Sequence, residues 1–198
     1  MTTEWLDGYQ PSSETEAADV ARVRQLIADG GDAWARDTPL HLTASALVVH
    51  PASGRVLLRW HQRQGRWLQV GGHGDPGEAD PLAIALREAR EETGLPDLAP
   101  WPDGRIWHVV ICDVAPGKGE PAHQHADLRY LMATEHPGTA RPETPDAALR
   151  WLTFDEARDL VGGNNLRITL DRAEQALAEA SQCGRAVPQR VGPAEHAG

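Results

Sequence analysis

Three glutamates on one short stretch of the chain have a spacing that brings their carboxylates together. Glu88, Glu91 and Glu92 stand at positions i, i+3 and i+4, which lie on one side of a helix. Like charges at this spacing destabilise a helix by roughly 0.2 to 0.5 kcal/mol per pair, and a bound divalent cation would reverse that penalty. Carboxylate oxygens are suitable ligands for Mg²⁺ or Mn²⁺. The competing interpretation is a solvated helix face on which Arg87 pairs with Glu91.

The residues around these glutamates predict the helix that positions them. Asp80 is a suitable N-cap, and Pro81 fits the first helical position, where its missing N–H costs nothing. Gly94 supplies the left-handed residue that commonly follows a helix, so we expect a helix from Pro81 to Thr93. Its apolar stripe, which should face a core, consists of Leu82, Ala85, Leu86 and Ala89.

The segment GGHGDPGEADPLAIALREAREETGL resembles the signature box of the Nudix hydrolase family. That box reads Gly-x5-Glu-x7-Arg-Glu-U-x-Glu-Glu-x-Gly-U, where U is aliphatic. All seven fixed identities are present, at Gly72, Glu78, Arg87, Glu88, Glu91, Glu92 and Gly94. The sequence departs from the pattern in two ways: eight residues instead of seven separate Glu78 from Arg87, and Ala89 is small for an aliphatic position. We expect the extra residue, Ala79, in the loop before the helix, where it could shift Glu78.

The resemblance implies a role for each box residue. Glu91 and Glu92 match metal ligands, with a backbone carbonyl of Gly71 or Gly72 as a further ligand. Glu88 matches a residue that binds metal or acts as general base. The expected metal ligands are therefore Glu88, Glu91, Glu92 and Gly72, and the expected catalytic residues are Arg87, which orients a glutamate, Glu88 and Glu91. With Mg²⁺ or Mn²⁺, the implied activity is hydrolysis of a diphosphate linkage in a nucleoside diphosphate joined to another group.

A second group of polar residues stands at the start of a predicted strand. His123, His125 and Asp127 alternate along the chain, so they should point the same way. This face could bind phosphate or metal, and the alternative is a polar strand end at the surface. His73 follows the Gly71-Gly72 turn, where it could either reach substrate or be structural. We take His73, His123, His125 and Asp127 as candidate substrate-binding residues.

Other functions on the same framework remain open at this point. One alternative is a non-catalytic Nudix-fold module that senses a nucleotide, and another is an isomerase of prenyl diphosphates. Both would be expected to have a degenerate box, whereas the box here is intact. The substrate is not specified: Val110, for instance, stands where an ADP-ribose type would show proline.

Expected strands come before, between and after the expected helices, and this order predicts an α/β fold. The family resemblance implies more specifically an α/β/α sandwich with a mixed β-sheet. We expect a helical extension over 1–38, the main domain over 39–180 and a disordered tail over 181–198. The expected strands are 42–49, 56–60, 67–70, 106–114, 128–134 and 149–154, and the expected helices, besides 81–93, are 13–30, 155–161 and 165–180.

The composition limits the choice of partners and compartment. A net charge of −10 argues against a basic groove for long nucleic acid or for an anionic membrane surface. No signal-like or membrane-spanning apolar stretch is visible, and the two cysteines, Cys112 and Cys183, stand far apart. We therefore expect a cytoplasmic protein that acts on a small nucleotide-like diphosphate. The helix near the N-terminus could serve a homodimer contact.

Overall fold

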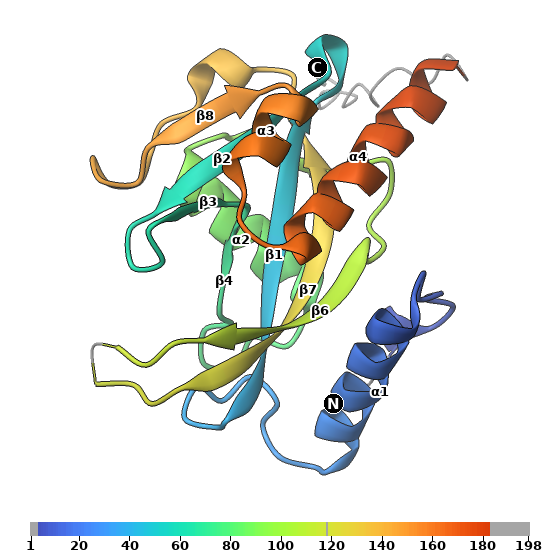
Figure 1. The fold of residues 1–198 in the computed structure, drawn as a ribbon, viewed down its shortest axis with the longest axis vertical. Helices are drawn as coiled ribbons and strands as arrows, with labels where there is room; N and C mark the ends of the chain where they lie inside the picture. Colours follow the sequence, from blue (N-terminus) through green and yellow to red (C-terminus); the bar gives the residue numbers. More distant parts are fainter. Residues whose placement is uncertain (1–3, 118, 183–198) are drawn as a thin grey trace, which may run out of the picture.

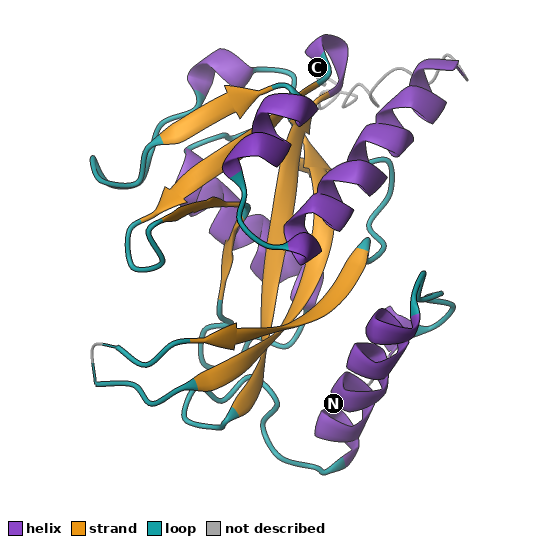
Figure 2. Ribbon diagram, viewed as in Figure 1, coloured by secondary structure: helices purple, strands orange, loops and turns teal. Residues whose placement is uncertain are grey.

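The computed structural model describes residues 4–117 and 119–182. Within these ranges, eight strands form one mixed sheet that lies between two helical layers (Figures 1 and 2). Helix α2 (Pro81–Thr93) covers one face, and helices α3 (Phe154–Leu160) and α4 (Asn164–Gln182) cover the other. Each face has its own apolar core, so the predicted sandwich with a mixed sheet is confirmed.

The sheet is organised around its two longest strands, β1 (Leu40–His50) and β7 (His123–Ala133), which run parallel. Strand β1 also pairs antiparallel with β2 and β4, and β7 pairs antiparallel with β5 and β6. The remaining strands are β2 (Arg55–His61), β3 (Arg66–Leu68), β4 (Val70–Gly72), β5 (Ala99–Pro100), β6 (His108–Val114) and β8 (Leu149–Leu152). The parallel pair brings residues near position 41 beside residues near position 125.

Most strands lie where the sequence predicts them, and three differ. Strand β7 begins five residues before the predicted start at Leu128, because its polar N-terminal half pairs with both β1 and β6. The predicted strand over 67–70 is divided at Gln69 into β3 and β4, which pair with different neighbours. The two-residue strand β5 was not predicted, since so short a segment carries no periodic signal.

Helix α2 has the predicted ends. The Asp80 carboxylate accepts hydrogen bonds from the backbone N–H groups of Leu82 and Ala83, at 3.0 and 3.3 Å. Gly94 follows the helix with a φ of 64°, the left-handed conformation that its lack of Cβ permits. The buried side of the helix, which includes Ile84, Ala85 and Ala89, packs against the sheet. Glu88 and Glu92 project from this same side towards β4, beside Gly72 and Gly71, whereas Glu91 is more exposed.

The N-terminal segment is part of the same core. Helix α1 (Glu14–Ala28), which follows a short 3-10 turn (Glu4–Leu6), lies against β6 and β1 and buries Val20 and Val23 there. Glu16 is also buried, and its carboxylate accepts hydrogen bonds from Arg172 of α4 and from Tyr9. The extension is thus tied to the rest of the fold by both apolar and ionic contacts.

Two further predictions concern the ends of the chain and membranes. Of the tail expected over 181–198, residues 181 and 182 belong to α4, and 183–198 lie outside the described residues, as does Cys183. Across 4–117 and 119–182, no helix is both long enough and apolar enough to cross a membrane.

Candidate active site and histidine cluster

Arg87 gathers three of the box glutamates around one guanidinium group. Its Nη2 donates to Glu78 at 2.9 Å, and its Nη1 donates to Glu88 at 2.9 Å and to Glu91 at 3.1 Å. The hydrogen bonds from Arg87 lower the pKa of the Glu78 carboxyl. Nη2 also donates to the backbone carbonyl of His73, at 2.9 Å. Arg87 therefore fixes the carboxylates and the loop before the helix at the same time.

Glu92 lies deeper, on the side of α2 that faces β4. One carboxylate oxygen accepts a hydrogen bond from the backbone N–H of Gly71 at 2.9 Å, and the other lies 3.2 Å from Arg59 Nη1. Burial raises the pKa of Glu92 to about 7 despite both contacts. Gly71 itself has a φ of 140°, and a Cβ there would lie 2.4 Å from the Cα of Ser45. Only glycine lets β4 approach β1 this closely while its N–H binds Glu92.

Glu88 lies beside Gly72, at the point where β4 leads into the box loop. A Cβ at Gly72 would lie 2.7 Å from Glu88 Oε2, so the absence of a side chain makes room for this carboxylate. Burial raises the pKa of Glu88, and the hydrogen bond from Arg87 only partly offsets that effect. The Gly72 backbone and the Glu88 carboxylate thus lie next to each other.

This group of oxygen donors fits a divalent cation electrostatically. Burial disfavours the charged forms of Glu88 and Glu92. Charge repulsion acts in the same direction: Glu91 raises the pKa of Glu88, and Glu88 raises the pKa of Glu92. Nearby positive charge from a divalent ion would favour the charged forms again. Hard oxygen ligands of this kind suit Mg²⁺ or Mn²⁺.

Four histidines form a second cluster, on strands β1 and β7 and on the loop after β4. His41 Nε2 lies 3.1 Å from His73 Nε2, and His123 Nε2 lies 3.1 Å from His125 Nε2. Burial lowers the pKa of His73 to about 4 and that of His125 to about 3. Burial lowers the pKa of His41 as well. The structure thus brings the predicted residues His73, His123 and His125 together, and those three burial effects favour neutral imidazoles.

Asp127 faces the same side of β7 as His123 and His125, as the alternation predicts, but its carboxylate has other partners. It is buried and forms an ion pair with Arg129, with Nε 2.9 Å from Oδ2. Ser45 Oγ and Gln69 Nε2 also donate to it, at 2.9 and 3.1 Å. Through these contacts, Asp127 links β7 to β1 and to Gln69.

Two participants were missed by the sequence analysis. His41 was not singled out. The alternation of His41, Thr43 and Ser45 with apolar residues along β1 was a signal that one face of this strand is polar at its start. Arg59 was also missed, because its contact with Glu92 joins β2 to α2 across 33 positions and no local pattern reports it.

Comparisons with known proteins identify the family and several relatives of this chain. A family model described as "NUDIX domain" matches residues 39–172. A protein named "Probable DHNTP pyrophosphohydrolase", from Lactococcus lactis subsp. cremoris (strain MG1363), is 34% identical over 108 residues. The matched region is 54% of this chain and 61% of that protein, so the chain spans less than two thirds of this curated relative.

Solved structures show the same fold. A NUDIX-family hydrolase from Clostridium perfringens matches with a TM-score of 0.53 and 25% identity, over 70% of this chain and 97% of that one. An Ap4A hydrolase from C. elegans gives a TM-score of 0.55 with 19% identity, over 70% and 98% of the two chains. The dihydroneopterin triphosphate pyrophosphohydrolase of E. coli gives 0.52 with 17% identity, over 69% and 94%.

Proposed function

Because this chain belongs to the Nudix family, we propose that it is a metal-dependent hydrolase that cleaves a diphosphate linkage. The substrate class is a nucleoside diphosphate, or a similar small molecule, joined to another group. The observation that carries this proposal is the contact of one guanidinium, that of Arg87, with Glu78, Glu88 and Glu91 at once. A solvated helix face needs only the pair of Arg87 with Glu91, whereas three carboxylates fixed beside the box loop are suited to an active site.

The metal ligands in this proposal are the carboxylates of Glu88, Glu91 and Glu92, with the backbone carbonyl of Gly72. Glu92 is held in place by the Gly71 N–H and by Arg59, and Glu88 is held by Arg87. When bound, Mg²⁺ or Mn²⁺ would neutralise charge on the phosphates and polarise the attacking water. The glutamates would thus be positioned before substrate arrives, which limits the reorganisation needed during the reaction.

Glu88 is the proposed general base. Arg87 binds its Oε1, and Oε2 lies next to Gly72, at the entrance to the box loop. A carboxylate at this position, next to the metal-bound water, could accept the proton that the water loses on attack. Arg87 contributes by orienting Glu88 and Glu91, and Glu78 contributes by orienting Arg87. Arg87 and Glu78 are therefore proposed as positioning residues.

The substrate would extend from the box towards the histidine cluster. His73 joins the two sites, because its backbone carbonyl accepts from Arg87 while its ring contacts His41. We keep His73, His123 and His125 as proposed substrate contacts, whereas Asp127, which was predicted with them, is buried and paired with Arg129 and is no longer proposed as a contact. The substrates named for the similar proteins, dihydroneopterin triphosphate and Ap4A, both contain the phosphate–phosphate bonds that this site would cut.

A substrate screen tests the proposal. The full-length protein would be incubated with nucleoside triphosphates, dinucleoside polyphosphates, nucleotide sugars and dihydroneopterin triphosphate, with Mg²⁺ or Mn²⁺, and the released products identified. We expect turnover of at least one compound, abolished by a chelator and restored by Mg²⁺. Binding of nucleotides without any product across the panel would overturn the proposal and favour a nucleotide-sensing module.

A further inference from the structure

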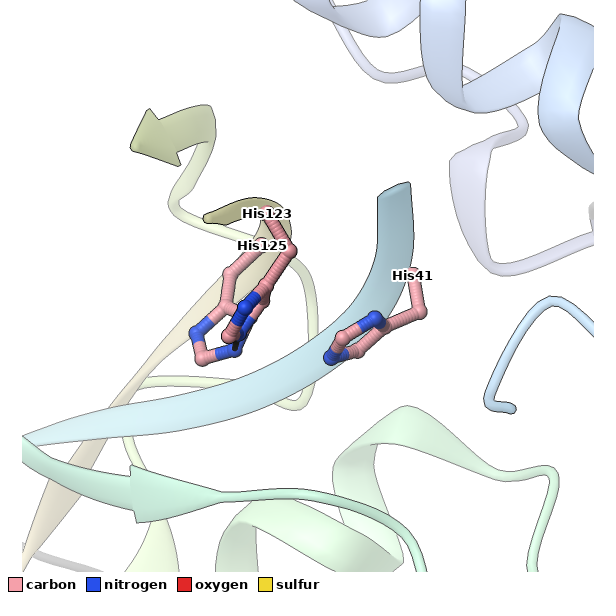
Figure 3. A group of neighbouring side chains, drawn as sticks. All are labelled: His41, His123 and His125. Carbon is pink, nitrogen blue, oxygen red and sulfur yellow. Dashed lines mark hydrogen bonds between the residues drawn. The ribbon is translucent and has the colours of Figure 1, made fainter. Parts of the chain in front are cut away.

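Three imidazole rings converge near the N-terminal ends of two parallel strands in the middle of the sheet. The parallel register places His41 of β1 directly beside His125 of β7, and His123 lies two residues earlier on the same face. One ring nitrogen from each of these histidines lies within 4.8 Å of the other two. Figure 3 shows the three rings directed towards one another, from neighbouring strand ends. Such a group of nitrogen donors is unlike the carboxylate set on α2.

Backbone carbonyls fix the tautomers of two of these rings. His41 Nδ1 lies 3.1 Å from the carbonyl oxygen of Thr38, and His123 Nδ1 lies 2.9 Å from that of Pro121. A carbonyl only accepts, so each Nδ1 must carry the hydrogen. In the neutral rings, the Nε2 atoms then carry lone pairs, and both are directed at a neighbouring imidazole. Metal-binding histidines typically have this arrangement, in which the second nitrogen donates to a carbonyl.

The distances are close to those of a tetrahedral site. With metal–nitrogen bonds of about 2.0 to 2.1 Å, two ligand nitrogens are separated by about 3.4 Å. His123 and His125 already approach this value, at 3.1 Å between their Nε2 atoms. The other separations, all within 4.8 Å, require side-chain shifts on the order of 1 Å.

We propose that His41, His123 and His125 bind a divalent transition-metal ion, and that Zn²⁺ is the ion they suit best. Imidazole nitrogens select zinc and its neighbours, whereas Mg²⁺ prefers the oxygen donors of the box. The inference does not depend on the proposed hydrolase activity. With three protein ligands, the ion keeps a position for water or for a substrate oxygen, which is compatible with a role of this face in substrate binding.

The site also has a structural connection to the box. The ring of His73 contacts His41, and the backbone carbonyl of His73 accepts a hydrogen bond from Arg87 at 2.9 Å. An ion bound to His41 Nε2 would replace the hydrogen bond of that atom with His73 Nε2, because the one lone pair can serve only one of them. Zinc binding should therefore release the ring of His73 from His41, and it should stabilise the fold by joining β1 to β7.

Zinc binding can be measured without any substrate. Full-length protein, stripped with a chelator and then freed of it, would be titrated with Zn²⁺ against a chromophoric chelator, in millimolar Mg²⁺ to occupy the oxygen site. We expect one tightly bound Zn²⁺ per chain. Thermal unfolding should shift upward by about 5 °C or more at a free Zn²⁺ concentration of about 100 times Kd. Co²⁺ should give the visible spectrum of a nitrogen-ligated, tetrahedral ion.

Substitutions assign the site. His125→Gln and, separately, His123→Gln should weaken Zn²⁺ binding by about 100-fold or more, since each removes a ligand. His123 is only half-buried at a strand end, so this second variant keeps the test valid if the first unfolds. His136→Gln, at an exposed histidine, is the matched control and should bind as the parent does. Glu92→Gln, in the box, should also keep the zinc.

Three results would overturn the proposal. One is a parent protein that binds no Zn²⁺ at micromolar concentration, which would leave the histidines as a hydrogen-bonded cluster. Another is unchanged zinc affinity in both His123→Gln and His125→Gln, which would place the ion elsewhere. Loss of zinc in Glu92→Gln but not in the histidine variants would likewise assign the ion to the box.

Discussion

The guanidinium of Arg87 contacts both carboxylate oxygens of Glu78: Nε lies 3.1 Å from Oε1, and Nη2 lies 2.9 Å from Oε2. The residue inserted between Glu78 and Arg87, relative to the family box, has therefore not separated them. The insertion is accommodated before the helix cap at Asp80, and the helix keeps its register. Glu78 thus holds Arg87, and Arg87 holds Glu88 and Glu91.

We expect Glu78→Gln to lower kcat/KM by about 10-fold, equivalent to about 1.4 kcal/mol of transition-state stabilisation. The substitution keeps the size of the side chain but weakens its hold on Arg87, so Glu88 and Glu91 lose their orientation. Steady-state kinetics on a substrate found in the screen would measure this. The control is Asp75→Asn, since Asp75 is exposed and lies 4.0 Å from Arg87. Equal activity of Glu78→Gln and the control would contradict the positioning role.

Gly72→Ala should reduce activity far more than it reduces stability. Its new Cβ would lie 2.7 Å from Glu88 Oε2, so the flexible carboxylate must move away from its present position. We expect a fall in kcat/KM of at least about 10-fold, with weaker Mn²⁺ binding. Gly31→Ala is the control for the added methyl group, because nothing lies within 4 Å of a Cβ there. Normal turnover in Gly72→Ala would show that the position of Glu88 is not critical.

The ion pair of buried Glu16 with half-buried Arg172 should make stability depend on pH. Burial alone would raise the pKa of Glu16, but hydrogen bonds from Arg172, Tyr9 and Ser12 outweigh it and lower the pKa to about 2, from 4.5. A carboxyl with a depressed pKa stabilises the folded state above its unfolded pKa, and the effect is lost as the pH falls towards 2. Its contribution near neutral pH is on the order of 2 to 3 kcal/mol.

Thermal unfolding of Glu16→Gln between pH 2 and pH 7 measures this contribution. At pH 7 the variant should melt about 5 °C or more below the parent, since its half-buried Arg172 lacks a charged partner. The difference should shrink steadily below about pH 4.5, because the unfolded parent then takes up a proton at Glu16 that the folded parent does not bind until about pH 2. Glu14→Gln, at an exposed position in the first turn of the same helix, is the control. A difference that stays constant with pH would contradict the ionic account.

The features that the sequence predicted correctly are those that neighbouring residues in the chain determine. Asp80, Pro81 and Gly94 specify both ends of α2 locally, and the spacing of the box glutamates places them on one helix face. The histidine cluster depends instead on the parallel register of His41 with His125, 84 positions apart. Alternation along β7 did show that His125 and Asp127 face one side, and it also places Arg129 beside Asp127, a local ion pair that the sequence analysis did not use. A long-range pairing such as that of His41 with His125 is absent from any local pattern.

Calorimetric titration of Mn²⁺ into the parent and into a Glu91→Gln, Glu92→Gln double variant tests the central claim most directly. Neither substitution changes side-chain size, and circular dichroism would verify that the variant is folded. The account predicts that Mn²⁺ affinity falls by at least about 100-fold in the variant and that turnover is lost with it. Unchanged Mn²⁺ affinity in the folded double variant would contradict the assignment of the metal to the carboxylates of helix α2.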